Sequence, residues 1–301
     1  MPEAPDRLPS EPPSIGSALA HGTAALNTVS DTPRRDASLL LARCAGLDQT
    51  ALIAHSDRPL DRIQHSRFTA AIARAASGEP IAYLLGSQPF WTLDLEVNDH
   101  TLIPRPDTET LVEQALERLP TESPTRVLDL GTGSGAVAIA IASERPHCRV
   151  TASDISAEAL AVARRNATRA GVAIDFFESD WFSNLPNTKA EASVAVAYDL
   201  IVSNPPNIAE GDPHLDAPAL RHEPQRALVS GPDGLDAVRT LIAQASGWLA
   251  PAGWLLLEHG YNQAEAVAGL MVTHHYRGIK TTHDLGGNPR VTSGQIPGTS
   301  A

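Results

Sequence analysis

The chain has 301 residues, of which 42% are hydrophobic and only 4% are aromatic, and its formal net charge is −12. This length and composition allow one large or two modest domains with aliphatic, alanine-rich cores. The acidic balance, without any basic run, argues against broad electrostatic binding to a nucleic-acid backbone, which requires clustered lysine and arginine. No apolar run is long enough to span a bilayer.

The first part of the chain predicts a leader followed by a helical domain. Residues 1–13 are acidic and proline-rich, lack the order of a secretory signal, and predict a disordered leader. Residues 14–86 place apolar side chains at three- and four-residue spacing, which predicts a small helical bundle. The two cysteines, Cys44 and Cys148, have neither disulfide nor metal spacing. We therefore expect a cytoplasmic protein.

Residues 87–107 predict a hairpin and linker. Residues 90–97 alternate apolar and polar side chains, which indicates a strand in a hairpin. Residues 101–107 contain too much proline for regular structure. We place the second domain at residues 108–296 and a short tail at residues 297–301.

The second domain alternates strand and helix signals. Strands are expected at residues 126–130, 148–152, 172–177, 200–203 and 254–258. One helix is expected to begin at Gly135, and a second to begin after Ser156, which would be its N-cap. A third is expected over residues 234–249. This alternation predicts an α/β fold, with a mostly parallel, doubly wound sheet covered by helices on both faces.

A glycine-rich loop follows the first of these strands. Residues 129–135 read Asp-Leu-Gly-Thr-Gly-Ser-Gly and lead into a helix. Glycines at alternate positions permit a tight turn and the close approach of a ligand. The loop also fits the dinucleotide fingerprint, and a tight turn without any ligand remains an alternative.

The next two strand ends add polar and aromatic groups. Asp154 follows the glycines by about twenty residues, where a carboxylate can accept both hydroxyls of a ribose. The alternative is that Asp154 caps its own helix. After the third strand, Asp180 can accept the exocyclic amine of adenine while Trp181 packs on the base. The three strand ends together predict a site for an adenosine-containing ligand.

The fourth strand ends in Asn204-Pro205-Pro206-Asn207. Proline has no N–H, so the carbonyl beside it is free to accept a hydrogen bond, and the side-chain oxygen of Asn204 is a second acceptor. Two rigid acceptors suit a planar NH₂ group, either of a carboxamide or of a nucleobase. They would orient its lone pair toward an electrophile such as the methyl group of a sulfonium.

These motifs together resemble those of the bacterial peptide chain release factor glutamine N5-methyltransferases. The resemblance covers nearly the whole chain after the leader. Further segments that carry it are Gly-Glu-Pro-Ile-Ala-Tyr-Leu at 78–84, Leu-Ile-Pro-Arg-Pro-Asp-Thr-Glu at 102–109, Asp-Pro-His-Leu at 212–215, Glu-Pro at 223–224, Leu-Leu-Leu-Glu-His-Gly at 255–260 and Asn-Pro-Arg-Val-Thr at 288–292.

The resemblance implies a class I S-adenosylmethionine-dependent methyltransferase fold, Rossmann-like, with the N-terminal helical bundle as substrate-recognition domain. It implies methyl transfer from S-adenosyl-L-methionine to the side-chain nitrogen of the glutamine in the Gly-Gly-Gln motif of release factors. The implied partners are release factors, without sequence-specific nucleic acid or membrane, and we expect a monomer. The residues implied to bind the cofactor are Gly131, Thr132, Gly133, Ser134, Gly135, Asp154, Asp180, Trp181 and Asn204.

The same resemblance implies that Asn204, Pro205, Pro206 and Asn207 frame the glutamine amide, with Asn204 and Pro205 as its catalytic acceptors. Asn207 departs from the family, which has an aromatic ring there, usually tyrosine. The ring would stack on the amide and shield it from water, which asparagine cannot do. This departure makes a non-catalytic cofactor-binding or interaction protein one alternative. An adenine-N6 methyltransferase acting on nucleic acid is another, because it would share the Asn-Pro-Pro chemistry. A dinucleotide-dependent oxidoreductase would explain the glycines but not Asn-Pro-Pro.

Other polar residues carry weaker signals. The eleven histidines are scattered and predict no metal site. For His259, at the end of the fifth strand, we expect a packing role rather than catalysis. Arg105, Asp107 and Glu109 are expected either to orient the linker or contact a protein substrate, or to form salt bridges between the domains.

Overall fold

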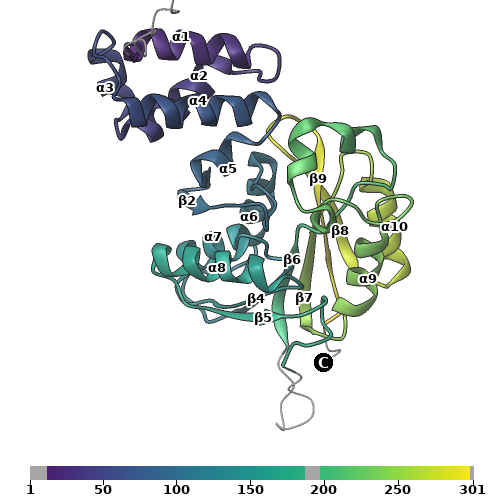
Figure 1. The fold of residues 1–301 in the computed structure, drawn as a ribbon. Coiled ribbons are helices and arrows are strands. Elements are labelled where there is room, and N and C mark those ends of the chain that lie inside the picture. Colours follow the sequence, from purple (N-terminus) through teal and green to yellow (C-terminus); the bar gives the residue numbers. More distant parts are fainter. Residues whose placement is uncertain (1–11, 187–196, 299–301) are drawn as a thin grey trace, which may run out of the picture. The chain divides into compact units, whose positions relative to one another are not determined.

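The computed structural model of the chain describes residues 12–186 and 197–298. The chain divides into two compact units, Met1–Gly86 and Ser87–Ala301, whose elements are drawn in Figure 1. Each unit has its own hydrophobic core. Of the expected leader, residues 1–11 lie outside the described residues, as do residues 299–301 of the expected tail. Among the helices that are described, none combines the length and the apolar character needed to cross a membrane.

The first unit is helical, as the sequence predicts. Its core contains the fully buried side chains of Ile15, Leu40 and Phe68. A capping box starts one of the helices, where Asp61 accepts from the Gln64 N–H and the Gln64 side chain accepts from the Asp61 N–H. The helices are α1 (Ile15–Leu26), α2 (Pro33–Ala45), α3 (Gln49–Ala54), α4 (Arg62–Ala76) and α5 (Ile81–Leu85).

The second unit begins with an antiparallel hairpin of β1 (Ser87–Phe90) and β2 (Leu93–Glu96). The single strand expected at residues 90–97 is therefore wrong in detail, because Phe90 ends one strand and the turn that follows separates it from the next. Phe90 and Leu95 are buried in the core of the second unit, so the segment expected as a linker is part of that unit. A short 3-10 turn, η1 (Pro106–Thr108), then leads into α6 (Glu109–Leu116).

The sheet of the second unit has seven strands within the described residues, in the order β5-β4-β3-β6-β7-β9-β8. The first five in chain order are parallel, while β9 is antiparallel to both of its neighbours. The strands are β3 (Arg126–Leu130), β4 (Arg149–Asp154), β5 (Ile174–Glu178), β6 (Tyr198–Ser203), β7 (Leu249–Glu258), β8 (Arg277–His283) and β9 (Pro289–Gln295). The predicted mostly parallel sheet is confirmed.

Side chains alternate between the two faces of this sheet, and each face has its own core. On β3, Val127 belongs to the core that includes α6 and α7, whereas Leu128 belongs to the core that includes α9 and α10. Figure 1 shows α7 and α8 on one side of the sheet and α9 and α10 on the other, which is a doubly wound arrangement. These helices are α7 (Ala136–Glu144), α8 (Ala157–Ala170), α9 (Asp236–Ala245) and α10 (Ala264–Thr273).

The central strands lie where the sequence places them, but the C-terminal part differs. The helix expected at residues 234–249 ends at Ala245, and Leu249 already starts β7, where it pairs with Tyr198. The antiparallel pair β8–β9 was not predicted. Both strands have few apolar side chains, with sequences RGIKTTH and PRVTSGQ. β8 is the edge strand, where less of the strand is buried. β9 lies between β7 and β8 and buries the polar side chains of Thr292 and Ser293, so its burial does not show as an apolar run.

Candidate active site

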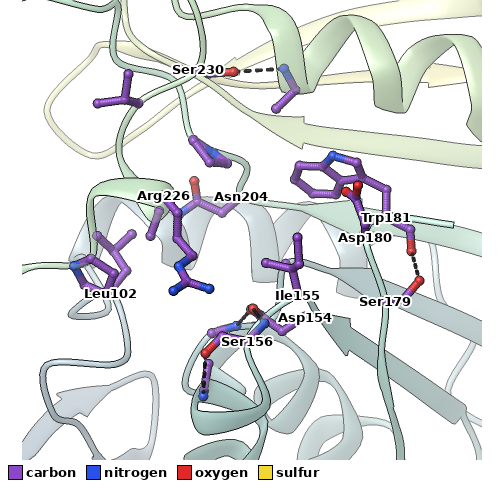
Figure 2. A pocket seen from close by; sticks show the side chains of 18 of the residues that line it. Leu102, Asp154, Ile155, Ser156, Ser179, Asp180, Trp181, Asn204, Arg226 and Ser230 are labelled. Carbon is purple, nitrogen blue, oxygen red and sulfur yellow. Dashed lines mark hydrogen bonds between the residues drawn. The ribbon is translucent and has the colours of Figure 1, made fainter. Parts of the chain in front are cut away.

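The site lies where the order of the strands reverses. Strand β3 has β4 on one side and β6 on the other, and the chain leaves β3 and β6 toward opposite faces, which opens a crevice at their carboxyl ends. A pocket of about 590 Å³ occupies this crevice (Figure 2). The lining residues from the strand ends are Gly131, Gly133, Asp154, Ile155, Ser156, Ser179, Asp180, Trp181, Asn204 and Pro206.

The glycine loop between β3 and α7 forms one wall of this pocket. Gly131, Gly133 and Gly135 all have positive φ, at 71°, 57° and 86°, which is a conformation that other residues rarely adopt. At Gly135 a Cβ would lie 2.8 Å from the Ile139 side chain, so glycine also permits α7 to start there. The loop thus presents bare backbone to the pocket.

Asp154, at the end of β4, is tied to the glycine loop. Its Oδ2 accepts from the Gly133 N–H at 2.9 Å and its Oδ1 accepts from the Ser156 N–H at 2.9 Å. Ser156 itself caps α8, accepting from the Ala159 N–H. Asp154 is therefore not the side-chain cap of its helix. Burial raises the pKa of Asp154, while the two N–H groups and the nearby Arg226 favour its ionised form.

The turn after β5 places an aromatic ring against the glycine loop. Trp181 has a φ of 48°, and its ring lies 3.5 Å from the position that a Cβ on Gly131 would occupy. Ser179 holds the turn, because its hydroxyl donates to the Trp181 carbonyl and accepts from the Asn184 N–H. Asp180 is exposed and lines the pocket. Figure 2 shows Trp181 and Asp180 on one side of the pocket, with Arg226 and Leu102 on the other.

The Asn-Pro-Pro-Asn turn follows β6 and is held at both ends. Asn204 Nδ2 donates to the Thr108 hydroxyl at 3.2 Å. The backbone of Asn207 donates to the Leu228 carbonyl at 3.2 Å, and its carbonyl accepts from Gln263 Nε2 at 2.9 Å. Gly234 packs on this turn so closely that a Cβ there would lie 2.4 Å from the Asn207 oxygen. The geometry of the turn is therefore fixed by its surroundings.

Not every site residue expected from the sequence lines the pocket. Thr132 and Ser134 are buried; the Thr132 hydroxyl donates to Asp129, and the Ser134 carbonyl accepts from Asn166. Pro205 is buried behind Asn204. The residues expected at the site but absent from the pocket wall are Thr132, Ser134, Gly135, Pro205 and Asn207.

Sequence reasoning missed one wall of the pocket. Leu102, Pro224 and Arg226 line it, together with further residues up to position 240. Buried Glu223 brings these segments together, because its carboxylate accepts from the Ile103 N–H at 3.1 Å and pairs with the Arg105 guanidinium. The motifs at residues 102–109 and 223–224 were the available signal, but neither follows a predicted strand end.

The remaining polar residues bond within the second unit. Arg105 pairs with Glu223, Asp107 pairs with Arg290 at 3.1 Å, and Glu109 accepts from the Trp91 N–H at 2.8 Å. The expected salt bridges between the domains are therefore wrong for these three residues, because each finds its partner in the second unit.

His259 is fully buried, with Nδ1 against the Gly260 carbonyl and Nε2 against the Thr292 hydroxyl. Burial also lowers its pKa, so the neutral form is favoured. Both ring nitrogens are occupied by structural contacts, which supports the expected packing role.

Comparison with known proteins agrees with this architecture. Residues 17–86 match the family model described as the PrmC N-terminal domain, and residues 108–231 match the methyltransferase small domain. The chain is 49% identical to the release factor glutamine methyltransferase of Xylella fastidiosa (strain 9a5c), over 88% of this chain and 94% of that protein. It is 45% identical to the release factor glutamine methyltransferase of Escherichia coli (strain K12), over 88% and 93%.

Among solved structures, a methyltransferase from Pyrococcus furiosus is similar with a TM-score of 0.50 and 18% identity, covering 77% of this chain and 99% of that one. At this identity the likeness shows the fold alone. It agrees with the class I methyltransferase fold expected from the sequence.

Proposed function

Because the chain belongs to the release factor glutamine methyltransferase family, we propose that it transfers a methyl group from S-adenosyl-L-methionine to the side-chain amide nitrogen of the glutamine in the Gly-Gly-Gln motif of peptide chain release factors. The observation that carries the proposal is the position of the Asn-Pro-Pro turn. Asn204 and Pro206 line the same pocket as the glycine loop and Asp154.

The pocket fits S-adenosyl-L-methionine in size and in chemistry. Its volume of about 590 Å³ lies within the usual range for cofactor sites. Each oxygen of Asp154 already accepts one backbone N–H and keeps a lone pair for a ribose hydroxyl. The bare backbone at Gly131 and Gly133 admits the ligand closely, and Asp180 and Trp181 would receive the adenine. S-adenosyl-L-methionine supplies a methyl group activated by a positively charged sulfur.

The chain's own contribution to methyl transfer is orientation. We assign the Asn204 Oδ1 atom and the carbonyl between Asn204 and Pro205 as the two acceptors for the glutamine NH₂ group. Two accepted hydrogen bonds fix the plane of the amide and aim the nitrogen lone pair. Orientation of this kind is worth on the order of 7 kcal/mol in well-aligned systems. Pro205 and Pro206 keep the turn rigid, since their φ angles are fixed.

We assign Thr132, Ser134 and Gly135 a supporting role. Thr132 and Ser134 fold the glycine loop through their bonds to Asp129 and Asn166, and Gly135 starts α7. Asn207 adjoins the acceptors in sequence and completes the frame around the glutamine. The helical unit, residues 14–86, is proposed to recognise the release factor.

We also propose that the enzyme is a cytoplasmic monomer. The cytoplasm is where release factors act, and both Cys44 and Cys148 are free thiols, as expected in a reducing compartment. Light scattering of the purified protein tests the monomer, and a dimer mass would contradict it.

A labelling assay tests the proposed function. The protein is incubated with methyl-labelled S-adenosyl-L-methionine and, separately, release factor, the release factor with its Gly-Gly-Gln glutamine replaced by alanine, and DNA. We expect label on the intact release factor alone. Label on DNA would instead identify an adenine methyltransferase, and cofactor binding without any transfer would identify a non-catalytic protein.

The Asn204→Ala variant tests the assigned acceptor. It should lose methyl transfer to release factor while its circular dichroism spectrum and unfolding temperature stay close to those of the unmodified protein. A fully active Asn204→Ala variant would refute the role of Asn204.

A further inference from the structure

The side-chain amide of Asn204 is the first member of a buried chain of hydrogen bonds. Asn204 Nδ2 lies 3.2 Å from Thr108 Oγ1, and the same Oγ1 lies 3.2 Å from Glu258 Oε1. Thr108 and Glu258 are buried, with 4% of each residue exposed. This chain of hydrogen bonds therefore runs from the pocket wall into the interior, between η1, the end of β6 and the end of β7.

Counting hydrogen atoms fixes the direction of this chain. A carboxylate only accepts, and a threonine hydroxyl has a single hydrogen to donate. When Glu258 is ionised, Thr108 must donate to Glu258 and can only accept from Asn204. Asn204 must then turn its NH₂ group toward Thr108, which leaves its Oδ1 atom as the acceptor for another partner.

The hydroxyl of Thr108 does not cap a helix. Thr108 ends η1 and leads directly into α6 with helical backbone angles (φ −66°, ψ −18°), not with the extended backbone from which a threonine side chain accepts a first-turn N–H. Here its side chain makes no capping bond and instead points to Glu258. The side chain therefore serves the chain of hydrogen bonds rather than the helix.

The carboxyl group of Glu258 has no evident structural use beyond Thr108. Its Oε2 atom accepts no hydrogen bond from the residues that the structure describes. Arg290, whose charge acts on Glu258, is paired with Asp107 at 3.1 Å and Asp284 at 3.0 Å. Burying a carboxyl group that lacks full pairing is costly, so its retention points to a role other than stability.

We propose that Glu258, acting through Thr108, is a positioning residue that holds the Asn204 amide with its oxygen toward the substrate nitrogen. A reversed Asn204 would present NH₂ to the substrate NH₂ group, and two donors cannot bond. This inference rests on the proposed function for its consequence, although the orientation of Asn204 is measurable without any substrate.

Two substitutions of Thr108 separate the effect of its hydroxyl group from the effect of its side-chain packing. Thr108→Val keeps the shape and removes the hydroxyl, whereas Thr108→Ser keeps the hydroxyl. Loss of one hydrogen bond that acts on orientation predicts a fall in kcat for release factor of about tenfold in Thr108→Val and recovery of most of it in Thr108→Ser. The dissociation constant for S-adenosylhomocysteine should stay unchanged in both.

Thr292→Val is the matched control. Thr292 is also fully buried in the second unit, and its hydroxyl contacts His259 and Thr281 rather than the pocket. It should lower the unfolding temperature without lowering kcat. A similar kcat loss in Thr108→Val and Thr292→Val, or no loss in Thr108→Val, would overturn the proposal.

Nuclear magnetic resonance of the Asn204 side chain makes the test independent of catalysis. The two NH₂ protons, assigned by their loss in Asn204→Asp, should exchange slowly with solvent in the unmodified protein and in Thr108→Ser, and rapidly in Thr108→Val. Unchanged exchange in Thr108→Val refutes the positioning chain. If the Asn204 NH₂ protons exchange slowly but the protein does not methylate release factor, the chain of hydrogen bonds is supported and the proposed function is refuted.

The pH dependence of kcat provides a further test, because a purely structural role of Glu258 would not change it. The charged groups that act on Glu258 are Arg290 on β9, Asp107 in η1 and Asp284 after β8. Burial raises the pKa of Glu258 to about 7, with Asp107 and Asp284 adding to the effect and Arg290 opposing it. Protonated Glu258 can donate to Thr108, which removes the fixed direction, so kcat should fall as pH drops through this range.

In Glu258→Gln this acid-side fall should vanish, because glutamine does not titrate. The matched comparison is Asp284→Asn, which removes a neighbouring charge and should retain a fall with a displaced midpoint. An identical acid limb in Glu258→Gln and the unmodified protein would contradict the role of Glu258.

Discussion

At the scale of single residues, Asp154 performs two tasks with one carboxylate. It holds the Gly133 and Ser156 N–H groups and also faces the pocket. Asp154→Asn keeps one oxygen and replaces the other with an NH₂ donor, which cannot accept from the backbone N–H that the lost oxygen held, and it removes the charged acceptor offered to the ribose hydroxyls. Charged hydrogen bonds of this kind contribute about 1.5–3 kcal/mol, so the dissociation constant for S-adenosylhomocysteine, measured by calorimetry, should rise tenfold or more.

The control for this measurement is Asp180→Asn. Asp180 also lines the pocket but is exposed, so the bond proposed between it and the adenine amine is weakened by water and its substitution should weaken binding less. Equal weakening in the two variants would contradict the larger contribution assigned to Asp154.

Asn207 gives the second prediction at this scale. The turn holds Asn207 through its backbone N–H and carbonyl, contacts that any other non-proline residue can keep. Asn207→Tyr should therefore leave the fold intact and add a ring beside the glutamine amide, shielding it from water. We expect a higher single-turnover methylation rate.

Asn207→Leu, which adds apolar volume without a ring, separates stacking from simple exclusion of water. It should raise the rate less than tyrosine does. An unchanged or lower rate in Asn207→Tyr would count against stacking as the missing element.

The residues that sequence reasoning found share one property. Asp154 is the last residue of β4, Trp181 lies in the turn after β5, and Asn204 directly follows β6, so the alternation of strands and helices was enough to bring all three to one edge of the sheet. Arg226 lies in a 3-10 segment, η4 (Gln225–Ala227), which is far in sequence from the end of any strand. Its place depends on the contacts of buried Glu223 with residues 103–105, which no local pattern reveals.

At the scale of elements, the burial of β3 has an electrostatic consequence. Asp129 sits on this central strand, is 1% exposed, and accepts from the Thr132 hydroxyl at 2.7 Å. Burial, reinforced by the charge of Asp154, raises the pKa of Asp129 from 3.8 to about 7, against the opposing hydrogen bonds. In the unfolded chain the same group titrates near its ordinary value.

The sign of the pH effect follows from this difference. Between about pH 4 and pH 7 the folded chain holds a proton on Asp129 that the unfolded chain has released, so the free energy of unfolding falls as pH rises through this window. Glu258 adds a slope of the same sign. Asp129→Asn, which does not titrate, should show a weaker fall, with a difference of a few kcal/mol at most.

Urea unfolding at several pH values across this window measures the effect. The Thr132→Val variant, which removes the donor to Asp129, should steepen the fall, since that bond favours the ionised carboxyl. A steeper fall in Asp129→Asn than in the unmodified protein would contradict this account of β3.

The elements themselves were predictable to different degrees. The central strands β3 and β6 are buried on both faces and read as short continuous apolar runs. The edge strand β8 and its neighbour β9 carry many polar side chains, and β9 pairs with β7 through contacts between segments far apart in sequence. The turn within the N-terminal hairpin was misplaced because Trp91 adopts a φ of 56°, which its sequence does not signal.

At the scale of the whole molecule, the two units have separate cores. Ile15, Leu40 and Phe68 belong to one cluster, while the clusters of the second unit contain residues from Phe90 onward. The described residues that line the pocket all belong to the second unit. A ligand in this pocket should therefore stabilise the second unit in particular.

Hydrogen exchange followed by mass spectrometry tests this expectation on the full chain. S-adenosylhomocysteine at one hundred times its dissociation constant adds about 2.7 kcal/mol to a unit that binds it only when folded. Amides of β3, β4 and β6 that exchange by unfolding of the unit should slow about a hundredfold. Amides of α1, α2 and α4 should keep their rates, because their unit holds no part of the pocket. Equal slowing in both units would mean that the chain unfolds as one cooperative whole. In Asp154→Asn, the slowing of exchange in the second unit should be smaller, in proportion to the weaker binding of S-adenosylhomocysteine.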